Sequence, residues 1–256
     1  MDSSPHPHQH STGDTVDQAA AEQTPVEQTP VEQSPVEQTP VEQSPVDQTT
    51  VQELAGRARR LASGGGRRIL GITGAPGAGK STVAAQLAAE LGAETAVLVP
   101  MDGFHLANSV LEALGRRMRK GAPDTFDDGG YAALLERLHC QTAQEPVIYA
   151  PDFRRELEEP IGSALPIRSD VPLVITEGNY LLLDGGWARA RDAMDEVWFL
   201  ETRDSIRRER LIRRHTLYGK TPDEARQWAL GSDEANARLI ASHRPRADAV
   251  FWVDGA

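Results

Sequence analysis

The sequence predicts a three-layer α/β domain, with helices on both faces of a mainly parallel sheet, preceded by a disordered tail. Two observations support this fold class. From residue 51 onward, short apolar runs alternate with helical segments, which is typical of buried parallel strands. The first fifty residues instead contain no Lys or Arg and carry Pro at a five-residue period. We therefore divide the chain into an acidic Pro-rich repeat tail, 1–50, and a folded domain, 51–256.

The tail repeats Gln-Thr/Ser-Pro-Val-Glu/Asp from Gln23 to Gln48. Pro in every period blocks helix propagation, and one Val per repeat buries too little apolar surface to offset the chain entropy. This composition favours a disordered, solvated tether. An arm that binds an unknown partner is the alternative.

The net charge of the folded part argues against binding to nucleic acid or to a membrane. The tail holds nine of the 38 acidic residues, so 27 basic and 29 acidic residues remain, and the domain is nearly neutral. A neutral domain gives no reason to expect binding to nucleic acid or to an anionic membrane. No stretch reaches the length of a membrane span, and no secretory signal is recognisable at the N-terminus, so we expect a cytoplasmic protein. A homodimer is compatible with the sequence.

The single cysteine, Cys140, cannot form an intramolecular disulfide. It continues a helical apolar pattern with Leu134, Leu135 and Leu138, which predicts a buried packing role rather than a nucleophile.

The hydrophobic pattern gives the following order of elements. We expect helices at 51–61, 82–91, 108–119, 131–141, 205–217 and 223–243, strands at 68–73, 96–101, 146–149, 171–176, 196–200 and 249–253, and a charged loop at 152–167. Asp127 or Asp128 is the expected N-cap of the fourth helix. Because the carboxyl ends of parallel strands share one edge, Gly74, Asp102 and Glu177 should lie close together there.

A complete G-x-x-x-x-G-K-[ST] phosphate loop, Gly74 to Ser81, stands between the first expected strand and helix. Gly-rich backbone lets N–H groups crowd around phosphate oxygens, while Lys80 reaches the β- and γ-phosphates and Ser81 binds Mg²⁺. The helix that follows points its positive end at the anion. The sequence therefore predicts a nucleoside triphosphate site. Its residues are Gly74, Ala75, Pro76, Gly77, Ala78, Gly79, Lys80, Ser81 and Thr82.

Two carboxylates follow other strands. Glu177 ends an apolar run and is the expected second metal ligand, with a loop-capping glutamate as the alternative. Asp102 could accept the proton of an attacking hydroxyl or orient it. His105 shares the same tight turn, and it is either a substrate contact or a capping histidine.

Arg207, Arg210 and Arg214 recur at i, i+3 and i+7, so they share one helix face. Three guanidinium groups suit triphosphate oxygens and the charge that develops during transfer, which favours a lid over the site. A solvated arginine-rich face is the alternative.

These segments together resemble the phosphoribulokinase, uridine kinase and type I pantothenate kinase superfamily of P-loop kinases, nearest its uridine-kinase-like branch. The likeness runs from about Arg67 to Asp254. It is carried by the phosphate loop, by Pro-Met-Asp-Gly-Phe-His-Leu, by Arg-Lys-Gly-Ala-Pro-Asp-Thr-Phe-Asp at 119–127, and by segments at 149–157, 175–184 and 246–250.

The resemblance implies a P-loop NTPase fold with a helical lid, ATP and Mg²⁺ as cosubstrate and cofactor, and transfer of the γ-phosphoryl group to a hydroxyl of a small molecule. It implies that Asp102 is the catalytic aspartate, that Ser81 and Glu177 hold the metal, and that Lys80, Arg207, Arg210 and Arg214 act in catalysis. Asp102, His105, Tyr149, Arg154 and Arg155 are the expected substrate contacts.

Two departures leave the acceptor open. Uridine kinases carry an acidic residue that binds ribose where this chain has Gly121, and pantothenate kinases place a substrate-binding histidine where it has Pro151. Neither specificity pocket is intact. The charged cluster at 152–156 either builds a different pocket, for a polyol or carboxylated acceptor, or is an ordinary exposed loop.

Kinase activity on a nucleoside, sugar or pantothenate-like acceptor is therefore the leading hypothesis. A nucleotide-hydrolysing switch or regulatory NTPase is the alternative, although the chain lacks the Asn-Lys-x-Asp guanine signature. A non-catalytic binding module, with the tail recruiting a partner, is the third.

Overall fold

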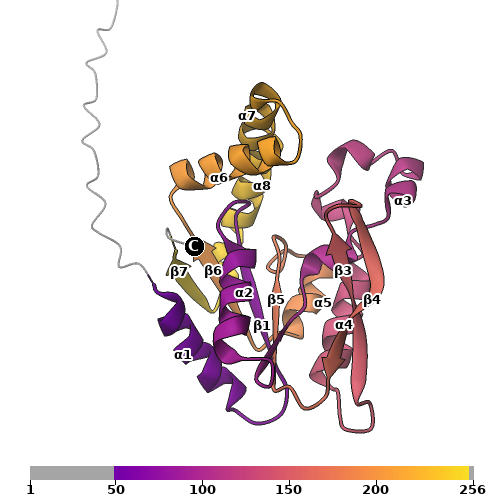
Figure 1. The fold of residues 1–256 in the computed structure, drawn as a ribbon, viewed down its shortest axis with the longest axis vertical. Helices are drawn as coiled ribbons and strands as arrows, with labels where there is room; N and C mark the ends of the chain where they lie inside the picture. Colours follow the sequence, from indigo (N-terminus) through magenta and orange to yellow (C-terminus); the bar gives the residue numbers. More distant parts are fainter. Residues whose placement is uncertain (1–48, 254–256) are drawn as a thin grey trace, which may run out of the picture. The chain divides into compact units, whose positions relative to one another are not determined.

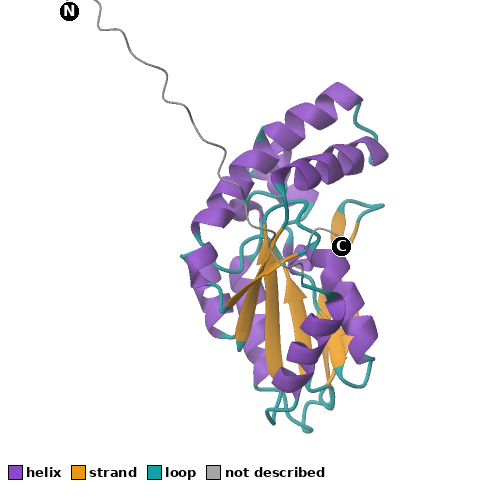
Figure 2. Cartoon of the chain, turned by 90° about the vertical axis from the view of Figure 1, so that its left-hand side faces the viewer, coloured by secondary structure: helices purple, strands orange, loops and turns teal. Residues whose placement is uncertain are grey.

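A five-stranded parallel sheet lies at the centre of the domain (Figures 1 and 2). The structure is a computed structural model that describes residues 49–253, so all but the last two residues of the predicted tail lie outside it. The strand order is β2-β5-β1-β6-β7, and every neighbouring pair is parallel. This arrangement confirms the predicted fold class. The strands are β1 (Arg68–Gly74), β2 (Ala96–Leu98), β5 (Leu173–Glu177), β6 (Glu196–Glu201) and β7 (Ala249–Trp252).

Side chains alternate between two cores on the two faces of the sheet. Val197 and Phe199 of β6 enter one core, whereas Trp198 and Leu200 enter the other, as strand geometry requires. Helices α1 (Val51–Ala62) and α2 (Lys80–Leu91) cover the second core. Helices α4 (Asp128–His139), α5 (Gly186–Asp192) and α8 (Ser232–Ser242) contribute to the first. Three layers result, as predicted.

An antiparallel hairpin replaces most of the expected charged loop at 152–167, and this prediction was wrong. Strand β3 (Val147–Arg154) pairs with β4 (Glu159–Arg168), with a register shift between Ala150 and Asp152. Ile148, Ala150 and Ile167 are buried in the core, so the base of the hairpin is anchored while its charged tip projects. The shift breaks the period-two pattern on which strand prediction depends.

Helices α6 (Asp204–Leu217) and α7 (Pro222–Leu230), with α8, form an antiparallel group beyond the end of β6 (Figure 1). The expected helix at 223–243 is two helices that meet at Gly231. A Cβ on Gly231 would lie 2.7 Å from the carbonyl oxygen of Gln227, so the glycine permits the break. Thr221 and Glu224 form a capping box that starts α7.

The segment between β2 and α4 is less helical than predicted. The 3₁₀ helix η1 (Met101–Phe104) follows β2, and α3 ends at Ala113 (Asn108–Ala113), so the expected helix at 108–119 is cut short. The 3₁₀ turns η2 (Arg117–Arg119) and η3 (Pro123–Thr125) complete the connection, and η4 (Arg244–Arg246) precedes β7.

Two predictions concern the ends of α4. Asp127 is the N-cap, because its side chain accepts a 2.8 Å hydrogen bond from the Gly130 amide. Cys140 is exposed, so its predicted burial was wrong. The apolar stripe of α4 ends at Leu138, and Cys140 is the C-cap beyond it.

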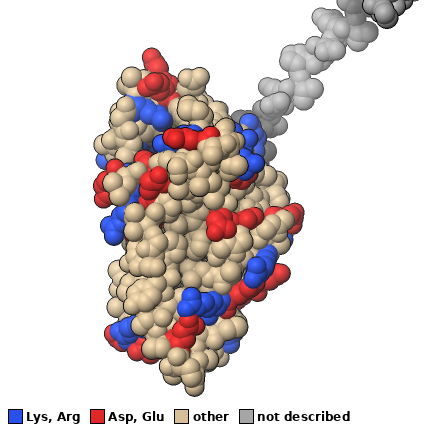
Figure 3. All heavy atoms as spheres, turned by 90° about the vertical axis from the view of Figure 1, so that its right-hand side faces the viewer, with Lys and Arg blue, Asp and Glu red and all other residues tan. Residues whose placement is uncertain are grey.

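Acidic and basic side chains are interspersed on the face that Figure 3 shows, without a broad patch of either sign among the described residues there. No helix within 49–253 is long and apolar enough to cross a membrane.

Candidate functional site

The phosphate loop turns between β1 and α2 with three glycines at positive φ: Gly74 at 151°, Gly77 at 83° and Gly79 at 94°. The Ala78 amide donates a 3.0 Å hydrogen bond to the Ala75 carbonyl, which tightens the turn. A Cβ on Gly77 would lie 2.7 Å from the carbonyl oxygen of Arg207, so α6 packs directly on the loop. Of the predicted loop residues, Gly74 ends β1, Ala75, Pro76, Gly77, Ala78 and Gly79 form the turn, and Lys80, Ser81 and Thr82 begin α2.

Lys80 curls back over this loop. Its Nζ donates hydrogen bonds to the carbonyl oxygens of Gly74, at 2.9 Å, and Ala75, at 3.2 Å. Burial lowers the pKa of Lys80 to about 8, and the nearby carboxylates of Glu177 and Asp102 oppose that shift. Lys80 therefore lies within electrostatic reach of both carboxylates that the sequence singled out.

Ser81 and Glu177, the two predicted metal ligands, contact each other. The Ser81 Oγ donates a 2.9 Å hydrogen bond to Glu177 Oε1, and Glu177 is buried. Burial raises the pKa of Glu177, as does the neighbouring Asp102 carboxylate, whereas Lys80 opposes the shift. A hydroxyl and a carboxylate are oxygen donors of the kind that Mg²⁺ prefers. The two side chains therefore fit the ion.

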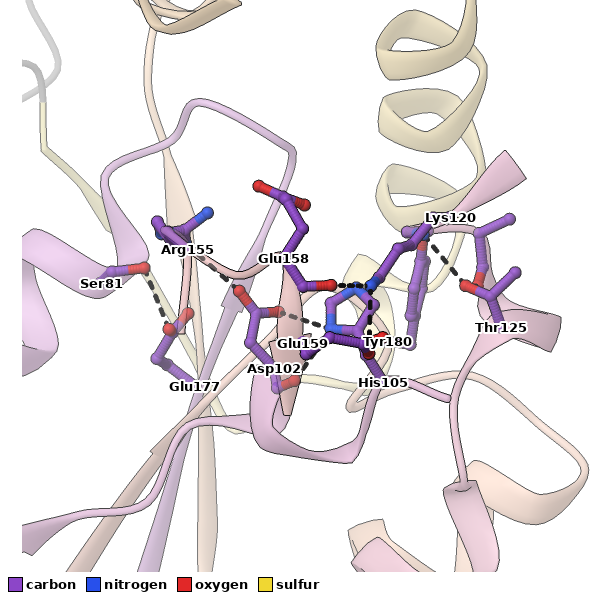
Figure 4. A network of polar contacts seen from close by, with 12 residues as sticks. Ser81, Asp102, His105, Lys120, Thr125, Arg155, Glu158, Glu159, Glu177 and Tyr180 are labelled. Atoms are coloured by element: carbon purple, nitrogen blue, oxygen red, sulfur yellow. Dashed lines mark hydrogen bonds and ion pairs between the residues drawn. The ribbon is translucent and has the colours of Figure 1, made fainter. Parts of the chain in front are cut away.

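Asp102 lies in η1, just beyond β2, with His105 one turn later (Figure 4). The His105 Nδ1 is 2.8 Å from the Asp102 carbonyl oxygen, which can only accept, so Nδ1 carries the proton. The imidazole packs between the rings of Phe126, at 4.0 Å between centroids, and Phe153, at 4.8 Å. Burial lowers the pKa of His105, so the ring is neutral at physiological pH.

An arginine at the tip of the hairpin, Arg155, lies beside Asp102. Arg155 Nη2 is 3.3 Å from Asp102 Oδ2. Arg154 instead faces Asp152, with Nε 3.6 Å from Oδ2. Tyr149 is 58% exposed and lies between the buried Ile148 and Ala150, so it projects from the opposite face of β3. Of the three predicted substrate contacts on β3 and its tip, the structure brings only Arg155 against Asp102.

Lys120 belongs to the same network but was not among the predicted site residues. Its Nζ donates to Asn108 Oδ1 at 2.7 Å and to the Glu158 carbonyl, and it lies 4.0 Å from Glu159 Oε2. It also lies over the Phe153 ring. Lys120 thereby connects the start of β4 to α3, and Figure 4 shows its contact with Glu158. Its place in the Lys-Gly-x-Pro segment was the available signal.

The three arginines of α6 have different surroundings. Arg207 is 2% exposed, and its guanidinium is held by Glu234, at 2.5 Å, and Asp204, at 3.1 Å. Arg210 is half-buried and Arg214 is exposed. Arg214 and Arg207 both contribute to lowering the pKa of Lys80, so they lie near the phosphate loop. Sequence spacing did not indicate that Arg207 would be buried in ion pairs.

The far end of this helical group carries a second cluster. Trp228 of α7 lies under the Lys220 ammonium, at 4.4 Å from the ring centroid. The His215 Nε2 is 2.7 Å from Asp233 Oδ2 and its ring lies beside Trp228.

A parallel sheet, a glycine-rich loop leading into a helix, a lysine folded over that loop and an acid at the end of the adjacent strand together define a phosphate-loop nucleotide-binding protein.

Comparisons with known proteins narrow this class. No family model matches the chain. A provisionally named uridine kinase of Schizosaccharomyces pombe is 31% identical over 210 residues, which cover 78% of this chain and 88% of that protein. An ATP-dependent kinase-like protein of Aspergillus versicolor is 36% identical over 152 residues, or 56% of this chain and 88% of the relative. The crystal structure of a provisionally named fructose transport system kinase from Silicibacter sp. TM1040 matches with a TM-score of 0.71 and 38% identity, over 79% of this chain and 99% of that one.

The chain therefore belongs to the phosphoribulokinase and uridine kinase superfamily of P-loop kinases. As a member of that superfamily it is an ATP-dependent phosphotransferase.

Proposed function

We propose that the protein transfers the γ-phosphoryl group of ATP to a hydroxyl of a small metabolite. The observation that supports this most is the convergence of Lys80, Glu177 and Asp102 at one edge of the sheet, where the two carboxylates both act on the pKa of Lys80. Two acids on neighbouring strand ends allow one to serve a metal and the other the acceptor.

Each residue then has one task. The phosphate loop and Lys80 bind the triphosphate, since Lys80 already lies along the loop carbonyls. Ser81 and Glu177 would hold Mg²⁺, which neutralises charge on the phosphate oxygens when bound. Asp102 orients the acceptor hydroxyl and accepts its proton as the oxygen attacks the γ-phosphorus, and ADP leaves. Arg207 joins α6 to α8 through Glu234, and its backbone packs against Gly77 of the loop. Arg210 and Arg214 of the same helix would contact the charged phosphate oxygens.

His105 and Arg155 surround Asp102 on its acceptor side. The neutral His105 fixes the Asp102 backbone through Nδ1, which leaves Nε2 as an acceptor for a substrate hydroxyl. Tyr149 and Arg154 are weaker substrate contacts, because neither lies against Asp102. The boundary at residue 50, a cytoplasmic location, a homodimer and a partner for the tail all stay predictions from the sequence.

The test is ATP turnover with a panel of nucleosides, sugars, hydroxy acids and pantothenate, measured for the wild-type protein and for Asp102→Asn. We expect at least one acceptor to raise ADP release in the wild type, and Asp102→Asn to lower kcat for it by about 10²- to 10⁴-fold while ATP still binds. Acceptor-independent turnover that Asp102→Asn leaves intact would contradict the proposal. A strong preference for GTP would favour the nucleotide switch.

A further inference from the structure

At the tip of the β3–β4 hairpin, the guanidinium of Arg155 lies against the carboxylate of Asp102, the proposed catalytic residue. Arg155 Nη2 lies 3.3 Å from Asp102 Oδ2, and the two side chains are 47% and 32% exposed. Both groups can therefore be reached from solvent. A guanidinium keeps its charge at any physiological pH, so Arg155 stays available to an anion throughout that range.

The ion pair competes with the task proposed for Asp102. A carboxylate oxygen that accepts an N–H from a guanidinium is less available to the hydrogen of an acceptor hydroxyl. A neutral acceptor that displaced Arg155 would leave the guanidinium without its carboxylate partner. Water would solvate this half-exposed guanidinium, whereas an acceptor with its own anionic group would give it a charge-assisted hydrogen bond in place of the one to Asp102.

A hollow beside this ion pair has room for such a molecule. It is open to solvent, with a volume of about 470 Å³. It is lined by the hairpin tip and the end of α6, namely Asp152, Phe153, Arg154, Arg155, Glu156 and Tyr218. Arg154 already faces Asp152 within the lining. Arg155 is the lining residue that also contacts Asp102, so it joins the hollow to the transfer site.

We propose that the acceptor carries a carboxylate or phosphate group next to its reactive hydroxyl, and that Arg155 is the residue that selects it. This inference rests on the proposed function. The anionic group takes over the Arg155 guanidinium, and Asp102 is released to the hydroxyl of the same molecule. Arg155 thus determines specificity, and its ion pair with Asp102 is broken when an acceptor with the right anionic group binds.

Matched acceptors test the proposal. With ATP, kcat and KM are measured for glycerate against glycerol, for ribose 5-phosphate against ribose, and for 2-amino-1,3-propanediol, whose amine would instead suit Glu156. We expect the anionic member of at least one pair to exceed its neutral partner at least tenfold in kcat/KM. Which pair responds distinguishes a carboxylate from a phosphate.

Variants assign the effect to the residue. Arg155→Gln should remove most of the preference for the anionic member, and Arg155→Lys should restore part of it, because an ammonium keeps the charge without the planar fork. Arg137→Gln is the control, since Arg137 of α4 is a similarly exposed arginine that is paired with Glu145. Preference for the neutral or amine compound, or equal loss in Arg155→Gln and Arg137→Gln, overturns the inference.

Thermal shift with each compound and an ATP analogue gives a readout that needs no turnover. If no anionic compound stabilises the wild type more than it stabilises Arg155→Gln, the inference fails even though ATP binds. The proposed function fails separately, when ATP binds and no compound of any charge raises turnover.

Discussion

Ser81 and Glu177 stand 96 positions apart in the chain, yet the Ser81 hydroxyl donates a 2.9 Å hydrogen bond to the Glu177 carboxylate. Ser81 lies in the first turn of α2 and Glu177 ends β5, and β5 pairs in parallel with β1, which leads into the phosphate loop. The sheet register, rather than any local sequence signal, therefore sets the geometry of the proposed metal site.

Removing the Glu177 charge should weaken the binding of Mg²⁺ specifically. We expect Glu177→Gln to raise the Mg²⁺ concentration for half-maximal turnover by at least about tenfold, because a neutral amide is a poorer ligand than a carboxylate. Calorimetric titration of the nucleotide in EDTA is the control, and its affinity should change little. Equal Mg²⁺ dependence in the variant and the wild type would remove Glu177 from the site.

The packing of α6 on the phosphate loop can be tested with two glycines of nearly equal φ. Gly77 lies at 83° and Gly92 at 82°, but a Cβ on Gly77 would meet the Arg207 carbonyl at 2.7 Å, whereas one on Gly92 would meet no atom within 4 Å. Both alanine variants carry left-handed strain of about 1–3 kcal/mol. We expect Gly77→Ala alone to displace α6 and to lower nucleotide affinity. Similar affinities in the two variants, measured by calorimetry, would show that the close approach is unimportant.

Glu234 should make stability depend on pH. Hydrogen bonds from Arg208 and Arg207 lower its pKa to about 2, against roughly 4.3 in an unfolded chain. As pH falls, the unfolded chain takes up the proton first, so the stabilisation is present above about pH 5 and is lost progressively toward pH 2. The difference in unfolding free energy between the wild type and Glu234→Gln should therefore shrink from pH 7 to pH 3 in urea titrations.

The control for that titration is Asp223→Asn, since Asp223 is 97% exposed and its pair with Arg226 is loose, at 3.5 Å. This variant should match the wild type at every pH. A Glu234→Gln difference that stays constant between pH 7 and pH 3 would contradict the expected linkage.

Lys120 should hold the start of β4 in place. Lys120→Met keeps the apolar stem over Phe153 but leaves Asn108 Oδ1 without its donor. The Glu158 carbonyl loses one of its two donors and keeps the Asn108 Nδ2 amide, so the cost should be about 1–3 kcal/mol. Lys220→Met is the matched control, because Lys220 also lies over an aromatic ring, that of Trp228. In thermal denaturation, Lys120→Met should lower Tm by several degrees more than the control substitution does. Equal shifts would mean that only the ring contact matters.

The sequence predicted the parts of the site that follow buried strands. Gly74, Asp102 and Glu177 each came after an apolar run, and parallel strands bring such positions to one edge. The hairpin was missed because its register shift and charged tip hide the alternation of a strand. The contact between Arg155 and Asp102 could not be predicted without that hairpin. Likewise, the burial of Arg207 depends on Glu234, which is 27 residues away on another helix.

The contact between Trp228 and Lys220 makes the fluorescence of Trp228 a probe of the position of helices α6 and α7. Trp187 and Trp198 are buried in the cores, and Trp252 is half-buried in β7. A cation also lies near Trp198, with Arg57 at 5.6 Å from the ring centroid, but Trp228 is the tryptophan of the α6–α7 region and has Lys220 over its ring at 4.4 Å. Indole fluorescence responds to a charge near the ring, so a displacement of Lys220 relative to α7 changes the emission of this one tryptophan. With the other three replaced by phenylalanine, a fluorimeter could follow the movement of these helices during turnover without any added dye.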